Sequence, residues 1–217
     1  MSVTREHLAQ TAEALRRNNM AAYVVDTKDE AVDLLKSLLK AGDVVGVGGS
    51  RTLDELGVLT LLRSGDYRFI DRYEPGLTPE QLREKCIAAL GADVFLCSSN
   101  AVTLNGELYN VDGMSNRVAA LCYGPRSVIL IVGKNKIVSD LKAAEHRVKT
   151  VAAPLNSARL NCDTYCHNQS VCVQADGAFC TDGCRSPARI CCTYVTMGYQ
   201  RIAGRIKVIL VNETLGF

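Results

Sequence analysis

Seven of the ten cysteines lie in one short stretch, residues 161–192, and thiols at this density bind soft metals or carry out redox chemistry. The spacing is not that of a known metal motif. The C-x2-C pairs typical of zinc knuckles are absent, and so is the bacterial ferredoxin run. The density predicts that sulfur ligands gather here. The seven are Cys162, Cys166, Cys172, Cys180, Cys184, Cys191 and Cys192.

Three interpretations of this segment stay open on the spacing alone. Four thiolates suffice for a [4Fe–4S] cluster, which is the first interpretation. Zinc is the alternative metal, and disulfides or unligated thiols are the third interpretation. Cys192 directly follows Cys191, so the two side chains rarely reach one metal, and we leave Cys192 out. The remaining cysteines lie in periodic segments and are expected to pack as small apolar side chains: Cys86, Cys97 and Cys122.

A second group of chemically useful residues follows the apolar segments that we expect to be strands. Residues 46–50 (GVGGS), 98–100 (SSN) and 110–113 (NVDG) each come after such a segment. Ligands of open α/β sheets bind beyond the carboxyl ends of the strands. Residues 46–50 match neither the dinucleotide fingerprint nor the P-loop, and a plain tight turn is the alternative. We expect an anionic ligand here, with Arg117 as a contact.

The composition limits the function classes. The formal net charge is +2, so a nucleic-acid partner is not expected. Hydrophobic residues make up 47% of the chain, which is enough for a full core. No apolar run is long enough to span a membrane, and the first residues carry charges where a signal peptide is apolar. We therefore expect a cytoplasmic protein.

The elements that must position these residues can be read from periodicity. Capping boxes at Thr27, Thr52 and Thr78 each begin a helix, and Asn105-Gly106 predicts a hairpin. Expected helices are 5–19, 28–39, 52–63, 79–90, 116–123 and 139–160, the last interrupted near Pro154. Expected strands are 21–26, 43–49, 68–72, 93–99, 127–133 and 205–211.

Strands that are apolar throughout and separated by helices are typical of α/β proteins. Such strands are buried on both faces, which predicts a mainly parallel sheet with helices on both faces. We expect one domain over residues 1–217, with 161–192 as an irregular, Cys-rich metal or redox segment.

Several stretches resemble the lactate-utilisation (LUD) domain, in particular its short, single-domain bacterial members. The most specific are GGSRTLDELG, SSNA followed by GELYNVDG, and NRVAA, and the resemblance covers nearly the whole chain. It implies a three-layer α/β fold similar to ribose-5-phosphate isomerase and CoA-transferase proteins, and no catalytic residue can be carried over. Positions matching the family pattern, and therefore candidate ligand-binding residues, are Gly48, Gly49, Ser50, Ser99, Asn100, Asn110, Asp112, Asn116, Arg117, Asn135 and Lys136.

The cysteine segment resembles the same family. Short LUD proteins show L-N-C-x3-C and then, after a loop, C-x2-C-x-S-P-x-R-I-C. In this chain the loop is longer and carries Cys172, and three residues separate Cys180 from Cys184. Either Cys172 or Cys180 therefore fits the third position. The implied metal ligands are Cys162, Cys166, Cys180, Cys184 and Cys191.

The resemblance favours an iron–sulfur cluster, because lactate-utilisation operons include iron–sulfur components. We therefore expect a redox protein that transfers electrons during lactate or other organic-acid oxidation, with other lactate-utilisation or redox subunits as partners. The alternative is an isomerase- or transferase-like enzyme, or a binding domain, for a phosphorylated or CoA-linked small acid, with structural zinc or disulfides. A third interpretation is a regulatory subunit that senses redox state. We expect no nucleic-acid or membrane partner, and apolar edge strands favour a homodimer.

Overall fold

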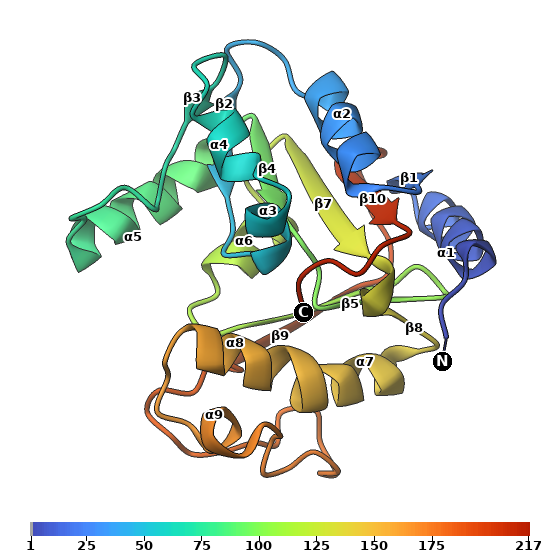
Figure 1. Cartoon of the computed structure of the whole chain (residues 1–217), viewed down its shortest axis with the longest axis vertical. Coiled ribbons are helices and arrows are strands. Elements are labelled where there is room, and N and C mark those ends of the chain that lie inside the picture. Colours follow the sequence, from blue (N-terminus) through green and yellow to red (C-terminus); the bar gives the residue numbers. More distant parts are fainter. Residues whose placement is uncertain (1) are drawn as a thin grey trace.

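A computed structural model describes residues 2–217 and contains two β-sheets with helices around them (Figure 1). The larger sheet has six parallel strands in the order β1-β10-β7-β4-β2-β3. This confirms the mainly parallel sheet expected from the sequence. The strands are β1 (Ala21–Val25), β2 (Val44–Val47), β3 (Arg68–Phe69), β4 (Val94–Cys97), β7 (Ser127–Gly133) and β10 (Ile206–Val211).

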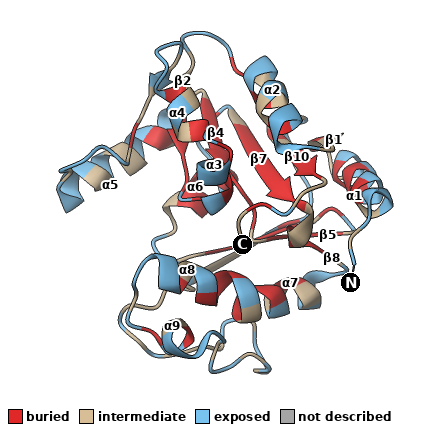
Figure 2. Ribbon diagram, in the orientation of Figure 1, coloured by how far each residue is buried: buried red, intermediate tan, exposed pale blue. Residues whose placement is uncertain are grey.

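Helices cover both faces of the larger sheet, as expected. On one face, α1 and α6 pack on side chains such as Phe95 and Leu130. On the other face, α2, α3 and α4 pack on side chains such as Leu96 and Ile131. Figure 2 shows the central strands as the most buried part of the view. The helices are α1 (Arg5–Arg17), α2 (Lys28–Leu38), α3 (Arg51–Glu55), α4 (Val58–Leu62), α5 (Pro79–Ala88), η1 (Ala89–Gly91) and α6 (Asn116–Cys122).

A second, four-stranded sheet in the order β8-β5-β6-β9 was not expected beyond its hairpin. The Asn105-Gly106 turn joins the antiparallel strands β5 and β6, as predicted. Val102 and Leu108 belong to the core with the larger sheet, whereas Tyr109 packs toward the helices on the other side. The strands are β5 (Ala101–Thr103), β6 (Leu108–Asp112), β8 (Ile137–Val138) and β9 (Thr193–Met197).

The helix expected over residues 139–160 forms with an interruption. Its parts are α7 (Leu141–Arg147), a π-helical turn η3 (Val148–Ala152) and α8 (Ala153–Arg159). Pro154 has no backbone N–H to donate to the preceding turn, and its ring crowds the carbonyl four residues back. A wider turn before Pro154 accommodates both effects. In Figure 1 these helices run below the sheets. The chain reaches α7 through the short helix η2 (Lys134–Lys136) and then β8.

Of the three predicted capping boxes, the one at Thr78 forms completely. Thr27 caps its helix by accepting from Glu30 N–H, but the Glu30 carboxylate accepts from Asp26 N–H and does not complete the box. The prediction for Thr52 is wrong, because α3 is capped by Ser50, two residues earlier, which accepts from Leu53 N–H. Thr52 cannot cap it because its hydroxyl turns inward and donates to the Leu215 carbonyl at 3.3 Å. Gly57, at φ +65°, then divides the expected helix into α3 and α4.

The cysteine segment is largely irregular, as predicted, and lies beside α8 and the second sheet (Figure 1). Its one helix is α9 (Tyr165–Gln169), capped by Thr164. Of the three outlying cysteines, Cys97 is buried in β4 as expected, while Cys86 is half-buried. Cys122 is exposed, so that packing prediction is wrong, because it is the last residue of α6. Within residues 2–217, none of the helices is long and apolar enough to cross a membrane.

Candidate functional site

A cavity of about 350 Å³ lies where β2, β4 and β6 end. Its volume is at the lower end of the range of small-molecule sites. Its lining comes from the polar segments that the sequence singled out, together with parts of α8 and the cysteine segment. Of the eleven predicted ligand-binding residues, those that line it are Gly49, Ser50, Ser99, Asn100, Asp112, Asn116, Arg117 and Lys136.

The other three predicted residues lie outside the lining and support it. A Cβ at Gly48 would come within 3.0 Å of Arg117, so glycine leaves room for that side chain. Asn110 is buried and accepts a hydrogen bond from Arg117 at 2.7 Å. Asn135 holds the chain after β10 by donating to the Gly216 carbonyl and accepting from Leu215 N–H.

Arg117 does not have the free guanidinium expected of an anion contact. Its Nε and one terminal nitrogen pair with Asp112, at 2.9 and 2.6 Å. Its other donors bond protein acceptors at 2.7 to 3.1 Å, so every N–H of the group is used. Those acceptors are the side-chain oxygens of Asn100 and Asn110 and the carbonyls of Ser98 and Val111. Arg117 therefore holds the polar strand ends in place.

Arg72 has a buried donor that is not used, and the sequence analysis missed this residue. Its Nε is buried without a hydrogen-bond partner among the described residues, and the side chain lines the cavity. The guanidinium carbon lies 5.6 Å from the centre of the Tyr73 ring. Asp71 fixes this turn by accepting from Arg63 at 2.7 Å and from Tyr73 N–H at 2.8 Å.

Arg72 was missed because the strand before it, β3, is shorter than expected. Residues 68–72 were expected to be one strand, but β3 ends at Phe69. Arg72 therefore lies in the turn that follows β3, at the same sheet edge as the other lining residues. The signal that could have found it was the position of an arginine two residues after the apolar pair Phe69-Ile70, at that edge.

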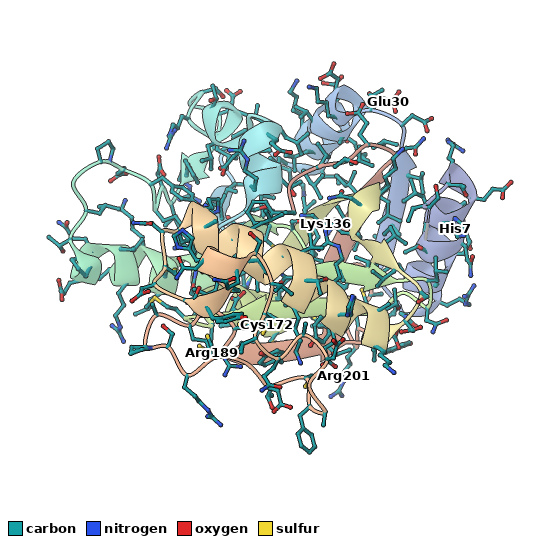
Figure 3. All side chains as sticks on the ribbon, turned by 60° about the horizontal axis from the view of Figure 1, so that its bottom comes forward. His7, Glu30, Lys136, Cys172, Arg189 and Arg201 are labelled. Carbon is teal, nitrogen blue, oxygen red and sulfur yellow. The ribbon has the colours of Figure 1, made fainter. Side chains whose placement is uncertain are left out.

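Lys136 is a buried amine at the edge of the cavity. The residue is 3% exposed, and its Nζ donates to Thr52 Oγ1 at 2.7 Å and Ser98 Oγ at 3.0 Å. Burial, together with the nearby cations Arg147 and Arg117, lowers the pKa of Lys136 to about 7. In Figure 3, Lys136 lies near the middle of the molecule, whereas Arg201 lies at its margin.

The charges of the lining favour an anion. Arg51, Arg72, Arg117 and Lys136 line the cavity, whereas the carboxylate in the lining is that of Asp112. Asp112 is neutralised by Arg117. Arg51 is paired with Glu55, and the pKa of Lys136 is lowered to about 7. Arg72 therefore carries the positive charge in the lining that can attract a carboxylate or a phosphate.

The cysteine segment does not form a finished metal site. All ten cysteines are free, and no three Cys, His, Asp or Glu side chains within residues 2–217 are grouped as metal ligands. This holds for the five predicted ligands Cys162, Cys166, Cys180, Cys184 and Cys191. The backbone is held by Arg189, which donates to the carbonyls of Thr181, Cys184 and Cys191 at 2.6 to 3.1 Å.

Several thiols nevertheless share one neighbourhood. Burial raises the pKa of Cys191, and the thiols of Cys172 and Cys166 lie near enough to raise it further. Tyr109 borders the same region. Burial raises the pKa of Tyr109, and the thiols of Cys180 and Cys191 lie near enough to its hydroxyl to raise it further. That hydroxyl is buried and has no hydrogen-bond partner among the described residues. A buried donor among thiols fits the chemistry of a sulfur-ligated centre, although the thiols are not arranged as ligands.

The segment also forms part of the cavity wall. Ile190 lines the cavity, together with Leu160 at the end of α8. Cys192 N–H donates to the Asp112 carbonyl at 2.9 Å, next to the carboxylate that pairs with Arg117. The cavity and the cysteine segment are therefore in direct contact.

Comparison with known proteins agrees with this fold. Residues 8–211 match the LUD domain. The crystal structure of a DUF162 family protein from Deinococcus radiodurans is similar with a TM-score of 0.51 and 18% identity, over 96% of this chain and 99% of that one. No curated protein matches the chain. Because the match to the family spans most of its length, the chain belongs to the LUD domain family, which is linked to lactate utilisation.

Proposed function

We propose that the cavity binds a small organic acid, free or phosphorylated, and that Arg72 is its anion contact. The observation that carries this proposal is the buried Nε of Arg72, which has no hydrogen-bond partner among the described residues and belongs to a side chain that lines the cavity. A buried donor without a partner costs free energy, which an anionic oxygen of a ligand would recover.

The volume narrows the ligand class. About 350 Å³ accommodates a short carboxylic acid or a sugar phosphate. A CoA-linked acid would place its acyl end in the cavity and the rest outside. The link of the LUD family to lactate utilisation supports a short acid of the lactate or pyruvate kind. We expect the protein to act there with other lactate-utilisation subunits.

A thermal-shift panel tests this proposal. The panel contains lactate, pyruvate, sugar phosphates, nucleotides and CoA esters, measured with the wild type, Arg72→Gln and the exposed-arginine control Arg201→Gln. We expect one class of small acid to stabilise the wild type and the control equally. Arg72→Gln should weaken that ligand's binding about tenfold, the usual effect of losing one charged hydrogen bond. The absence of stabilisation by every anion would refute the proposal, as would equal binding by Arg72→Gln.

A second candidate function is electron transfer through an iron–sulfur cluster in the cysteine segment. The favouring observation is the unpartnered hydroxyl of Tyr109 beside Cys180 and Cys191. When bound, such a cluster supplies one-electron transfer. Its ligands would come from Cys162, Cys166, Cys184 and Cys191, together with Cys172 or Cys180. These side chains must move together to hold it, because the described residues form no ligand group.

Metal analysis of protein prepared without oxygen decides this point. A cluster predicts about four iron atoms and as many sulfides per chain. Cys191→Ser should abolish them, while Cys122→Ser, which changes an exposed thiol outside the segment, should not. About one zinc per chain would instead indicate a structural zinc site and count against the cluster. Metal-free protein would rule out both and leave the thiols unligated.

A further inference from the structure

Lys136 combines features that its hydrogen bonds alone do not explain. It is the last residue of η2, which follows β7, the strand next to β4 in the larger sheet. The amine is almost fully buried, yet it borders the cavity. The carboxylate of Glu55 is near enough to raise the pKa of Lys136, but it forms an ion pair with Arg51 at 3.2 Å. A buried lysine without a carboxylate partner costs stability, so its presence at a cavity suggests a chemical role.

We propose that Lys136 is a nucleophile that forms an imine with the carbonyl carbon of a small oxo acid bound in the cavity. The inference rests on the proposed function for the acid's anionic end, which Arg72 would hold. It adds the class of substrate, a carbonyl acid, and the atom that reacts with it, Lys136 Nζ.

The hydrogen bonds of Lys136 leave its lone pair free. Thr52 uses its own hydrogen for the Leu215 carbonyl, so it accepts from Lys136. Ser98 provides the second contact through its hydroxyl oxygen. A neutral amine has two hydrogens, and these two contacts occupy both. The remaining position on nitrogen is then the lone pair, which is what attacks a carbonyl carbon.

The charges around Lys136 favour the neutral form. Arg147 on α7 and Arg117 on α6 oppose protonation, and so does burial. Glu55 on α3 and the thiol of Cys97 on β4 favour it more weakly. The resulting pKa of about 7 leaves much of the amine unprotonated at neutral pH, whereas an ordinary lysine is almost entirely protonated there.

The reaction balances without an external oxidant or reductant. The amine nitrogen forms a bond to the carbonyl carbon and loses a proton, and the carbonyl oxygen takes up that proton, which gives a carbinolamine. The hydroxyl group then leaves with a second proton as water, and a protonated imine remains. Over both steps, amine plus carbonyl plus one proton gives iminium plus water. The hydroxyl of Ser98, 3.0 Å from Nζ, is placed to relay a proton between nitrogen and oxygen.

Reductive trapping tests the proposal on the whole chain. Pyruvate and cyanoborohydride are added at pH 7, and hydride from the reagent converts an imine into a stable secondary amine. We expect one adduct per chain, and peptide mapping should place it on Lys136. Labelling there should exceed that of Lys134, which is part of the same helix η2, by about tenfold, because an ordinary lysine is almost entirely protonated at this pH. Lys136→Met should lose the adduct, and the control Lys134→Met should keep it.

Two further measurements separate the possible failures. Propanal, an uncharged aldehyde, tests the nucleophile without any anion contact. Labelling of Lys136 by propanal but not by pyruvate would support the nucleophile and count against the proposed acid ligand. If pyruvate stabilises the protein but neither carbonyl labels Lys136 preferentially, the imine proposal is overturned and the acid-binding proposal stands. The peptide map of the wild type decides the matter even if Lys136→Met fails to fold.

Discussion

Two arginines near the cavity have opposite roles, and the difference follows from their partners. Arg117 uses all its donors on protein acceptors, whereas the Nε of Arg72 has none among the described residues. The sequence pointed to Arg117 because it matches the family pattern near a helix start. A guanidinium's partners depend on which distant chain segments meet, so the choice between two arginines needs the folded structure.

Replacing Arg117 should therefore mainly destabilise the protein. Arg117→Met leaves Asp112 buried without its counter-ion and removes the hydrogen bonds to Asn100 and Asn110. We expect a loss of about 3 kcal/mol in the free energy of unfolding, measured by chemical denaturation. Arg126→Met, a change at an exposed arginine, should lie within about 0.5 kcal/mol of the wild type. A loss as small for Arg117→Met would contradict this role.

The lowered pKa of Lys136 predicts how the free energy of unfolding depends on pH. This pKa is about 7 in the folded state, against 10.5 for an ordinary lysine. Between these values the unfolded chain binds more protons, so this residue makes stability rise with pH. Lys136→Met removes that dependence. From pH 7 to pH 9, the wild type should gain about 1 kcal/mol per pH unit relative to Lys136→Met, measured by denaturation at each pH. A constant difference would mean that the lysine titrates normally.

At the scale of elements, the continuous apolar strands were predictable. The β7 range of 127–133 was expected and is observed, because seven uncharged residues between turn signals have few alternatives. The second sheet was not predictable in the same way. Its strands β5 and β8 have only three and two residues, and β6 pairs with β9 from the far side of the cysteine segment. Short strands with distant partners leave little periodicity in the sequence.

The hairpin turn provides a test at this scale. Gly106 has φ +79°, and an added Cβ would come within 2.7 Å of the backbone of Ala14 and Leu15 in α1. Gly42 has a similar φ of +82° but open space around it. Gly106→Ala should cost about 2 kcal/mol more than Gly42→Ala in thermal or chemical denaturation. Equal costs would mean that the close approach of α1 to the hairpin is absent in solution.

At the scale of the whole molecule, the fold brings the carboxyl ends of strands from both sheets to one cavity. For β2 and β4 the sequence predicted this convergence, because parallel strands end at the same edge. β6 reaches the cavity from the second sheet, where it is antiparallel to both of its neighbours. The sequence also predicted a crowded cysteine segment but not its detailed arrangement. Irregular loops lack the periodicity that fixes helices and strands, so the spacing alone left Cys172 and Cys180 as alternatives for one position.

The cavity and the cysteine segment are in direct contact. Ile190, from the cysteine segment, lines the cavity, and Cys192 bonds the backbone of Asp112. An acid in the cavity and any centre formed by the thiols would therefore lie on two sides of one wall. This arrangement suits a protein in which acid binding and redox state are linked.

The most direct test of the account is a crystal structure with the acid that stabilises the chain most strongly. The account predicts that the acid lies in the cavity where β2, β4 and β6 end, with an anionic oxygen within hydrogen-bond distance of Arg72 Nε. An acid bound elsewhere on the molecule would contradict the account. So would an acid in the cavity whose oxygens leave that nitrogen without a partner.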